Sequence, residues 1–75
     1  MKIVVETGKW AARYVDERMI SLDMPEASTV ADVIHAMGIP SDEAGLAVIN
    51  GRSVSKEYIL ANGNVLTLHP IIVGG

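Results

Sequence analysis

Residues 28–40 carry the strongest structural signal in this chain, a short amphipathic helix. Apolar side chains recur at i, i+3, i+4 and i+7 as Val30, Val33, Ile34 and Met37, which is the spacing of one helical face. One helix of this length can cover one face of a small sheet, but it cannot form a core alone. The rest of the core must therefore come from strands.

Both ends of this helix are marked in the sequence. Thr29 can cap the first turn, and Asp32 three residues later forms a capping-box pair that also suits the helix dipole. Gly38 is the expected left-handed terminator, and Pro40 prevents the helix from continuing. We therefore expect the helix to extend from about residue 30 to residue 37.

The segments around the helix have the length and composition of strands. Alternation is clearest between residues 19 and 24, and Leu66 and Leu68 share one face of the last segment. Asn50-Gly51 and Asn62-Gly63 are tight-turn signals. We expect a loop or irregular hairpin at residues 10–18, a polar loop at 41–43 and one helical turn within 55–60. The expected strands are residues 2–6, 19–24, 46–49, 52–54 and 65–69.

This order of elements predicts a two-layer α+β domain. The first and last strands can pair side by side while the helix crosses between two hairpins, which is the β-grasp layout. We expect a mixed sheet of four to five strands covered by one main helix. Residues 1–70 would form the domain, and residues 71–75 would form a flexible tail that leaves the sheet edge.

Composition narrows the classes of function. The chain has 75 residues and no cysteine, so an aliphatic core has to stabilise it without disulfides. A formal net charge of −3 argues against nucleic-acid binding, which needs a surplus of Lys and Arg. No apolar run is long enough to span a membrane, and no signal peptide is visible, so we expect a cytoplasmic protein. The two histidines have no acidic or cysteine cluster beside them, so no metal site is predicted.

The sequence ends on Gly74-Gly75, after the apolar run of residues 70–73. Two glycines add nothing to a core, but they allow a terminal carboxylate to enter a narrow slot in another protein, because no side chain branches from them. The alternative is a frayed end without a role.

Three stretches give the chain a family resemblance. They are the helix start at residues 28–33, the turn Val48-Ile49-Asn50-Gly51-Arg52, and the closing stretch from Asn62 to Pro70 followed by Ile71-Ile72-Val73-Gly74-Gly75. Together they resemble the ubiquitin-like sulfur carriers of the ThiS/MoaD family, which includes the thiamine-biosynthesis carrier and the small subunit of molybdopterin synthase. The chain departs from the family pattern at Asn62 and Asn64, where aspartates are usual, and at His69, where molybdopterin-type members often carry an aromatic residue.

The resemblance implies a carrier, not an enzyme. An ATP-dependent activating enzyme (an adenylyltransferase) would join AMP to the Gly75 carboxylate, and a persulfide or thiol would then displace AMP to leave a thiocarboxylate. The sulfur donor must lie outside a chain without cysteine. The acceptor would be a synthase large subunit in the molybdopterin or tungstopterin pathway, or a thiazole synthase in the thiamine pathway. The chain itself would bind no cofactor, and ATP would be used by the partner.

The residues expected to contact partners lie in and near the tail. Residues 70–73 would set the exit angle and grip the partner, and Val48, Leu68 and Arg52 are candidates for a patch on the exposed sheet face. The predicted partner-binding residues are Gly74, Val73, Ile72, Ile71, Pro70, His69, Leu68, Arg52 and Val48.

Two other functions stay open, namely a ubiquitin-like protein modifier conjugated through Gly75 and a non-covalent β-grasp binding module. Among the remaining residues, we expect His35 and His69 to be surface side chains and Trp10 to pack against the core. Asp42-Glu43 is expected to be a solvated loop.

Overall fold

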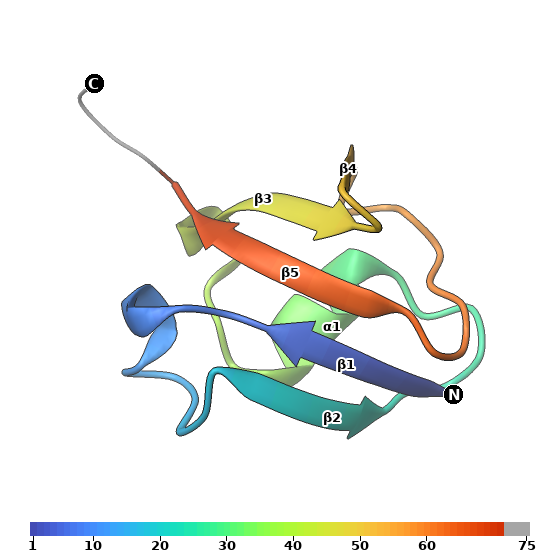
Figure 1. The fold of residues 1–75 in the computed structure, drawn as a ribbon, viewed down its shortest axis with the longest axis horizontal. Coiled ribbons are helices and arrows are strands. Elements are labelled where there is room, and N and C mark those ends of the chain that lie inside the picture. The colour runs from blue at the N-terminus through green and yellow to red at the C-terminus, as the bar shows by residue number, and fades with distance from the viewer. Residues whose placement is uncertain (72–75) are drawn as a thin grey trace.

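The computed structural model describes residues 1–71, which form two layers (Figure 1). A five-stranded sheet has the order β2-β1-β5-β3-β4, and helix α1 covers one of its faces. The predicted α+β architecture is thereby confirmed. The elements are β1 (Lys2–Glu6), η1 (Lys9–Ala11), β2 (Met19–Asp23), α1 (Val30–Ala36), η2 (Ser41–Glu43), β3 (Ala44–Ile49), β4 (Arg52–Val54) and β5 (Val65–Pro70), where η marks a 3₁₀ turn.

Strand β5 lies in the middle of the sheet, where it determines the exit of the chain. It pairs in parallel with β1 on one side and antiparallel with β3 on the other. The predicted pairing of the first and last strands is therefore confirmed. The expected departure from a sheet edge is wrong, because the edge strands are β2 and β4. The chain instead leaves from the end of the central strand.

Helix α1 begins as the sequence predicts. The Asp32 amide donates to Thr29 Oγ1 at 3.2 Å, and the Thr29 amide donates to Asp32 Oδ2 at 2.9 Å, which completes the capping box. The helix ends at Ala36, one residue earlier than expected, and Met37 is its C-cap. Gly38 has φ +74°, the left-handed conformation expected after a helix.

The core lies between α1 and the sheet and is aliphatic. Alternate residues of the three inner strands face the helix, including Val5 of β1 and its parallel partner Leu66 of β5. Trp10 and Tyr14 pack at the margin of this cluster. The buried apolar residues are Ile3, Val5, Ala11, Val30, Val33, Ile34, Met37, Ile39, Ala44, Ala47, Ile49, Leu60, Leu66 and Leu68.

Three connections differ from expectation or refine it. Residues 10–18, expected to be a loop or irregular hairpin, are a loop that contains the end of η1 and a series of turns, and residues 41–43 form η2. The expected helical turn within 55–60 is absent from the described structure. Residues 55–58 instead form a single hydrogen-bonded turn, in which the Tyr58 amide donates to Ser55 O at 3.1 Å. The residues that follow bond to the start of α1, where the Val30 amide donates to Tyr58 O and the Leu60 amide donates to Ser28 O. The Asn50-Gly51 hairpin is confirmed, with φ of 53° and 76°.

Helix α1 has 7 residues. Within residues 1–71, no helix combines the length and the apolar character that a membrane crossing requires.

Candidate functional site

The end of β5 is the point where the described structure reaches the predicted tail. We call Pro70 and Ile71 the tail base. Pro70 ends β5, and Ile71 is exposed over 46% of its surface. The predicted site residues Ile72, Val73, Gly74 and Gly75 lie outside the described residues.

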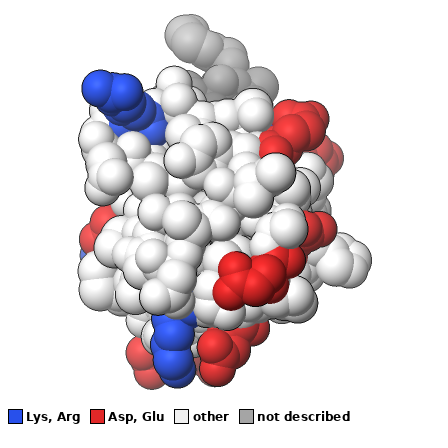
Figure 2. Space-filling view, turned by 90° about the vertical axis from the view of Figure 1, so that its right-hand side faces the viewer, with Lys and Arg blue, Asp and Glu red and all other residues white. Residues whose placement is uncertain are grey.

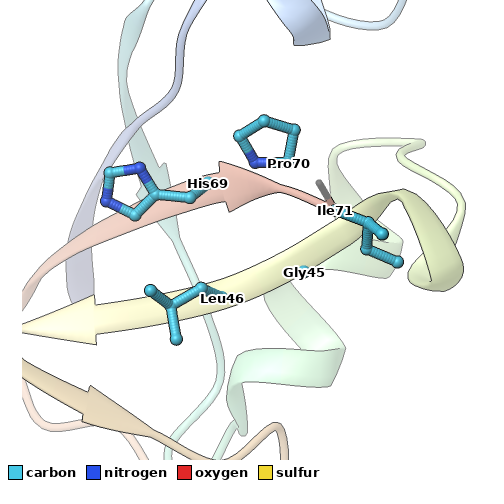
Figure 3. A pocket seen from close by; sticks show the side chains of 5 residues that line it. All are labelled: Gly45, Leu46, His69, Pro70 and Ile71. Carbon is cyan, nitrogen blue, oxygen red and sulfur yellow. The ribbon is translucent and has the colours of Figure 1, made fainter. Parts of the chain in front are cut away.

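Ile71 is held against the beginning of β3. Its amide donates to the backbone oxygen of Glu43 at 3.3 Å. Gly45 lies directly beneath it, as Figure 3 shows. A Cβ added to Gly45 would lie 2.8 Å from both Cα and Cγ1 of Ile71 and 2.9 Å from its nitrogen. Carbon atoms do not approach that closely, so Ile71 can cross β3 only over a residue without a side chain.

A bulge in β3 produces this close approach. Ala44 pairs with Pro70 and Leu46 pairs with His69, so β3 has one extra residue, Gly45, between two consecutive residues of β5. Such a bulge bends the strand and changes the direction of the side chains next to it. The feature was missed in the sequence, although an isolated glycine inside an apolar strand is a recognised signal of a bulge or a close backbone approach.

On its other side the tail base meets η1 and η2. The Tyr14 hydroxyl donates to Glu43 Oε2, so the residue whose backbone holds Ile71 is itself held through its side chain. The hydrogen bond to Glu43 is the main cause that raises the pKa of Tyr14, and desolvation adds to the effect. The expectation that Asp42-Glu43 is only a solvated loop is therefore wrong for Glu43, which is half-buried.

Two surface hollows flank Ile71. One is lined by Gly45, Leu46, His69, Pro70 and Ile71, and the other by Trp10, Asp42, Glu43, Pro70 and Ile71. Trp10 packs against the core as predicted and also borders the tail base. The three segments that meet here, η1, η2 and the end of β5, lie at the same end of the sheet in Figure 1. An extended chain that leaves this point has apolar surface on both sides.

The sheet face away from α1, which we call the open face, is partly apolar. Val48 lies on it opposite Thr67, and Leu46 lies on it opposite His69. Leu46 and Val65 are 46% and 44% exposed. The open face comprises Lys2, Val4, Glu6, Leu46, Val48, Val65, Thr67 and His69 of the three inner strands, and Met19, Ser21 and Asp23 of β2.

Two residues predicted for this face are elsewhere. Leu68 is only 2% exposed and belongs to the core, because it pairs with buried Ala47 on the helix side. Arg52 pairs with buried Ile49, so it projects from the opposite face to Val48. The expectation that Leu66 and Leu68 share one face is confirmed, and the structure places that face against the helix. On β3, Leu46 shares the open face with Val48.

The polar groups of the described residues suggest neither a metal site nor a basic surface. Within residues 1–71, no three His, Asp or Glu side chains converge as a metal site requires. His35 is exposed on α1 and His69 is exposed on the open face, as expected. Figure 2 shows one side of the molecule, where separate acidic and basic groups surround an uncharged area.

Comparison with known proteins identifies the fold. The family model described as Mut7-C ubiquitin matches residues 4–73. The chain is 20% identical to SAMP1 of Haloferax volcanii, with 100% of both chains covered and a TM-score of 0.74. It is also 20% identical to a Pyrococcus furiosus protein described as a candidate molybdopterin converting factor, subunit 1, with 96% and 99% covered and a TM-score of 0.79. No curated protein sequence matches the chain significantly. At this identity the structural neighbours establish the β-grasp, ubiquitin-like fold.

Proposed function

The chain belongs to the Mut7-C ubiquitin family, and on that premise we propose that it is a sulfur carrier activated at the carboxylate of Gly75. The observation that carries the proposal is the tail base. Ile71 is hydrogen-bonded to Glu43 at the end of the central strand and is flanked by two hollows, so the chain beyond it starts from a defined point.

The proposed chemistry takes place in partner enzymes. A carboxylate is ionised at neutral pH and resists nucleophilic attack, so it has to be activated first. A Gly75 oxygen attacks the α-phosphorus of ATP, which forms an acyl-adenylate and releases pyrophosphate. The persulfide of a sulfur donor then displaces AMP, and a second thiol cleaves the sulfur–sulfur bond to leave the thiocarboxylate. The partner supplies the electrostatic stabilisation of these steps, and this chain supplies the reacting group.

Chain geometry limits how far the reacting group can travel. From Ile71, four further residues carry the last Cα at most about 14 Å, even when fully extended. The activating enzyme must therefore dock the domain closely and accept the tail in a narrow channel. The absence of side chains on Gly74 and Gly75 fits such a channel.

The open face is the proposed docking surface for the activating enzyme and for the synthase. It adjoins the tail base through Leu46 and His69, which also line one of the hollows (Figure 3). Its exposed apolar side chains include Met19, Leu46 and Val65, and docking of a partner would bury them.

A second candidate function is protein modification. The Haloferax neighbour is described as a small archaeal modifier protein. The same acyl-adenylate would then pass to a lysine amine of a target protein, forming an isopeptide bond instead of a thiocarboxylate. The Pyrococcus neighbour is described as a converting-factor subunit, which favours the carrier function. The two functions share activation and differ in the acceptor.

Mass spectrometry of the protein purified from its native cells tests the proposal and separates these functions. The carrier function predicts an intact mass that ends at Gly75, with a fraction in which one oxygen is replaced by sulfur. The modifier function predicts Gly-Gly remnants on lysines of other proteins. A mass that shows further residues after Gly75, or a terminus that the cell's adenylating enzyme and ATP never modify, would overturn both.

A further inference from the structure

We infer that Gly45 is a positioning residue for the activation of the Gly75 carboxylate. The inference rests on the proposed function, and it concerns a residue of β3 that is 30 positions away from the reacting group. Gly45 does not touch the reacting atoms. It acts through Ile71, because its bare backbone is what allows the chain to cross β3 at that point.

The close contact involves backbone more than side chain. Of the three nearest atoms to a Cβ at position 45, two are the Cα and the nitrogen of Ile71. A flexible side-chain end could turn away, but these two atoms cannot move without displacing the chain. The same nitrogen donates the hydrogen bond to Glu43, so a Cβ here would push directly on the bond that holds the tail base.

The requirement for glycine at this position is therefore not conformational. Gly38, Gly51 and Gly63 all have positive φ and open space around the missing side chain. Gly45 is the reverse case, since its nearest neighbours leave no room and its φ lies outside the left-handed region. Glycine is needed here because only a residue without a side chain lets the backbone of Ile71 lie this close to β3.

The direction of the chain at Ile71 matters because the tail is short. Because four residues reach at most about 14 Å, a displacement of Ile71 displaces the whole region that the Gly75 carboxylate can reach. Misplacing a reacting group by about 1 Å can cost on the order of a hundredfold in rate. Gly45 therefore determines whether a docked domain delivers its carboxylate to the activating site.

The direct experiment compares Gly45→Ala with Gly51→Ala. Both variants add one methyl group to a glycine of the β3 region, but Gly51 is in the β3–β4 hairpin, and a Cβ there meets no atom within 4 Å. Gly51→Ala strains a positive φ and so controls for lost stability. Pyrophosphate exchange with the source organism's own adenylating enzyme would give kcat and KM for each. We expect kcat to fall about tenfold to a hundredfold in Gly45→Ala. We expect little change in KM, and Gly51→Ala close to the unaltered protein.

A second variant approaches the same contact from the tail. Ile71→Pro removes the N–H that donates to Glu43 without adding anything at position 45, and the same loss of kcat is expected. Equal activity of Gly45→Ala and Gly51→Ala, or full activity of both Gly45→Ala and Ile71→Pro, would overturn the inference.

An NMR measurement makes the inference testable apart from the proposed function. In ¹H–¹⁵N spectra, Gly45→Ala should shift the Ile71 amide and speed its hydrogen exchange, whereas Gly51→Ala should leave both unchanged. If the unaltered protein is never adenylated, the proposed function fails while this result still decides whether Gly45 holds the tail base. An Ile71 amide that is unmoved in Gly45→Ala contradicts the inference whatever the activity.

Discussion

The side chain of Glu43 accepts a hydrogen bond from Tyr14, while the backbone oxygen of the same residue accepts one from Ile71. Glu43 of η2 thus joins Tyr14, which follows η1, to Ile71, the last described residue. The turns after β1, which are remote in sequence from the tail, thereby become part of its support.

The first prediction concerns the titration of Tyr14. Its pKa lies above the ordinary phenol value of about 10, mainly because the neutral hydroxyl donates to Glu43. Absorbance titration of a Tyr58→Phe variant, which leaves Tyr14 as the only tyrosine, should show this raised midpoint. Adding Tyr14→Phe should remove the transition. A midpoint at or below the ordinary value would contradict the hydrogen bond.

The same shift predicts how stability depends on pH. The native state holds the Tyr14 proton more tightly than the unfolded state, so this contribution is complete below about pH 10. It is lost as the pH rises through the raised native value. Urea unfolding at about pH 8 and about pH 11 should therefore show a larger loss for the unaltered protein than for Tyr14→Phe. Equal losses would show that the bond contributes nothing.

The open face gives a prediction about docking. Leu46→Glu places a charge in the proposed interface, so it should raise KM for the adenylating enzyme. It should change the unfolding midpoint less than a core substitution would, because 46% of the Leu46 surface is already exposed. Ile59→Glu is the matched control, since Ile59 is also an exposed apolar residue but bridges to Thr29 beside α1. Similar effects of the two changes would show that the open face is not the interface.

The two sides of the sheet can be tested by stability. Leu68→Ala should destabilise the protein by about 2–5 kcal/mol, the usual cost of truncating a buried leucine. Val48→Ala should cost clearly less, because Val48 is half-buried on the open face. Denaturant unfolding measures both. A larger effect at Val48 would reverse the assignment of faces.

Local signals explain why so much of the fold could be predicted. The capping box of Thr29 and Asp32, the Asn50-Gly51 turn and the alternation in β5 each depend on neighbours in sequence, and the structure confirms all of them. The segment 55–60 could not be predicted in this way. It forms a hydrogen-bonded turn from Ser55 to Tyr58 but no helix, because Tyr58 and Leu60 bond to Val30 and Ser28 at the start of α1.

The candidate site was less accessible from sequence for the same reason. The tail base is assembled from η1, η2, β3 and β5, and no local pattern brings Trp10, Glu43 and Gly45 to Ile71. Even so, the sequence contains one signal of the bulge, because a glycine among the apolar residues of a strand often marks a bulge or a close approach of another backbone. The placement of Leu68 was wrong because the alternation put Leu66 and Leu68 on one face without showing which face the helix covers.

The cap of α1 provides a prediction about stability alone. Thr29→Ala removes the side chain that accepts from the Asp32 amide, and it should cost about 1 kcal/mol in the free energy of unfolding. Thr29→Ser keeps the hydroxyl and should restore most of that loss. Neither change should alter adenylation beyond its effect on the folded fraction, since the cap is at the far side of the sheet from the open face.

The central claim is that the Gly75 carboxylate is the group on which partner enzymes act. Incubation with the source organism's adenylating enzyme, ATP and a sulfur donor, followed by intact mass spectrometry, tests it most directly when the full chain is compared with a variant lacking Gly75. The account predicts replacement of one terminal oxygen by sulfur in the full chain, no change in the shortened one, and the same unfolding midpoint for both. Equal modification of the two proteins, or modification at any other residue, would contradict it.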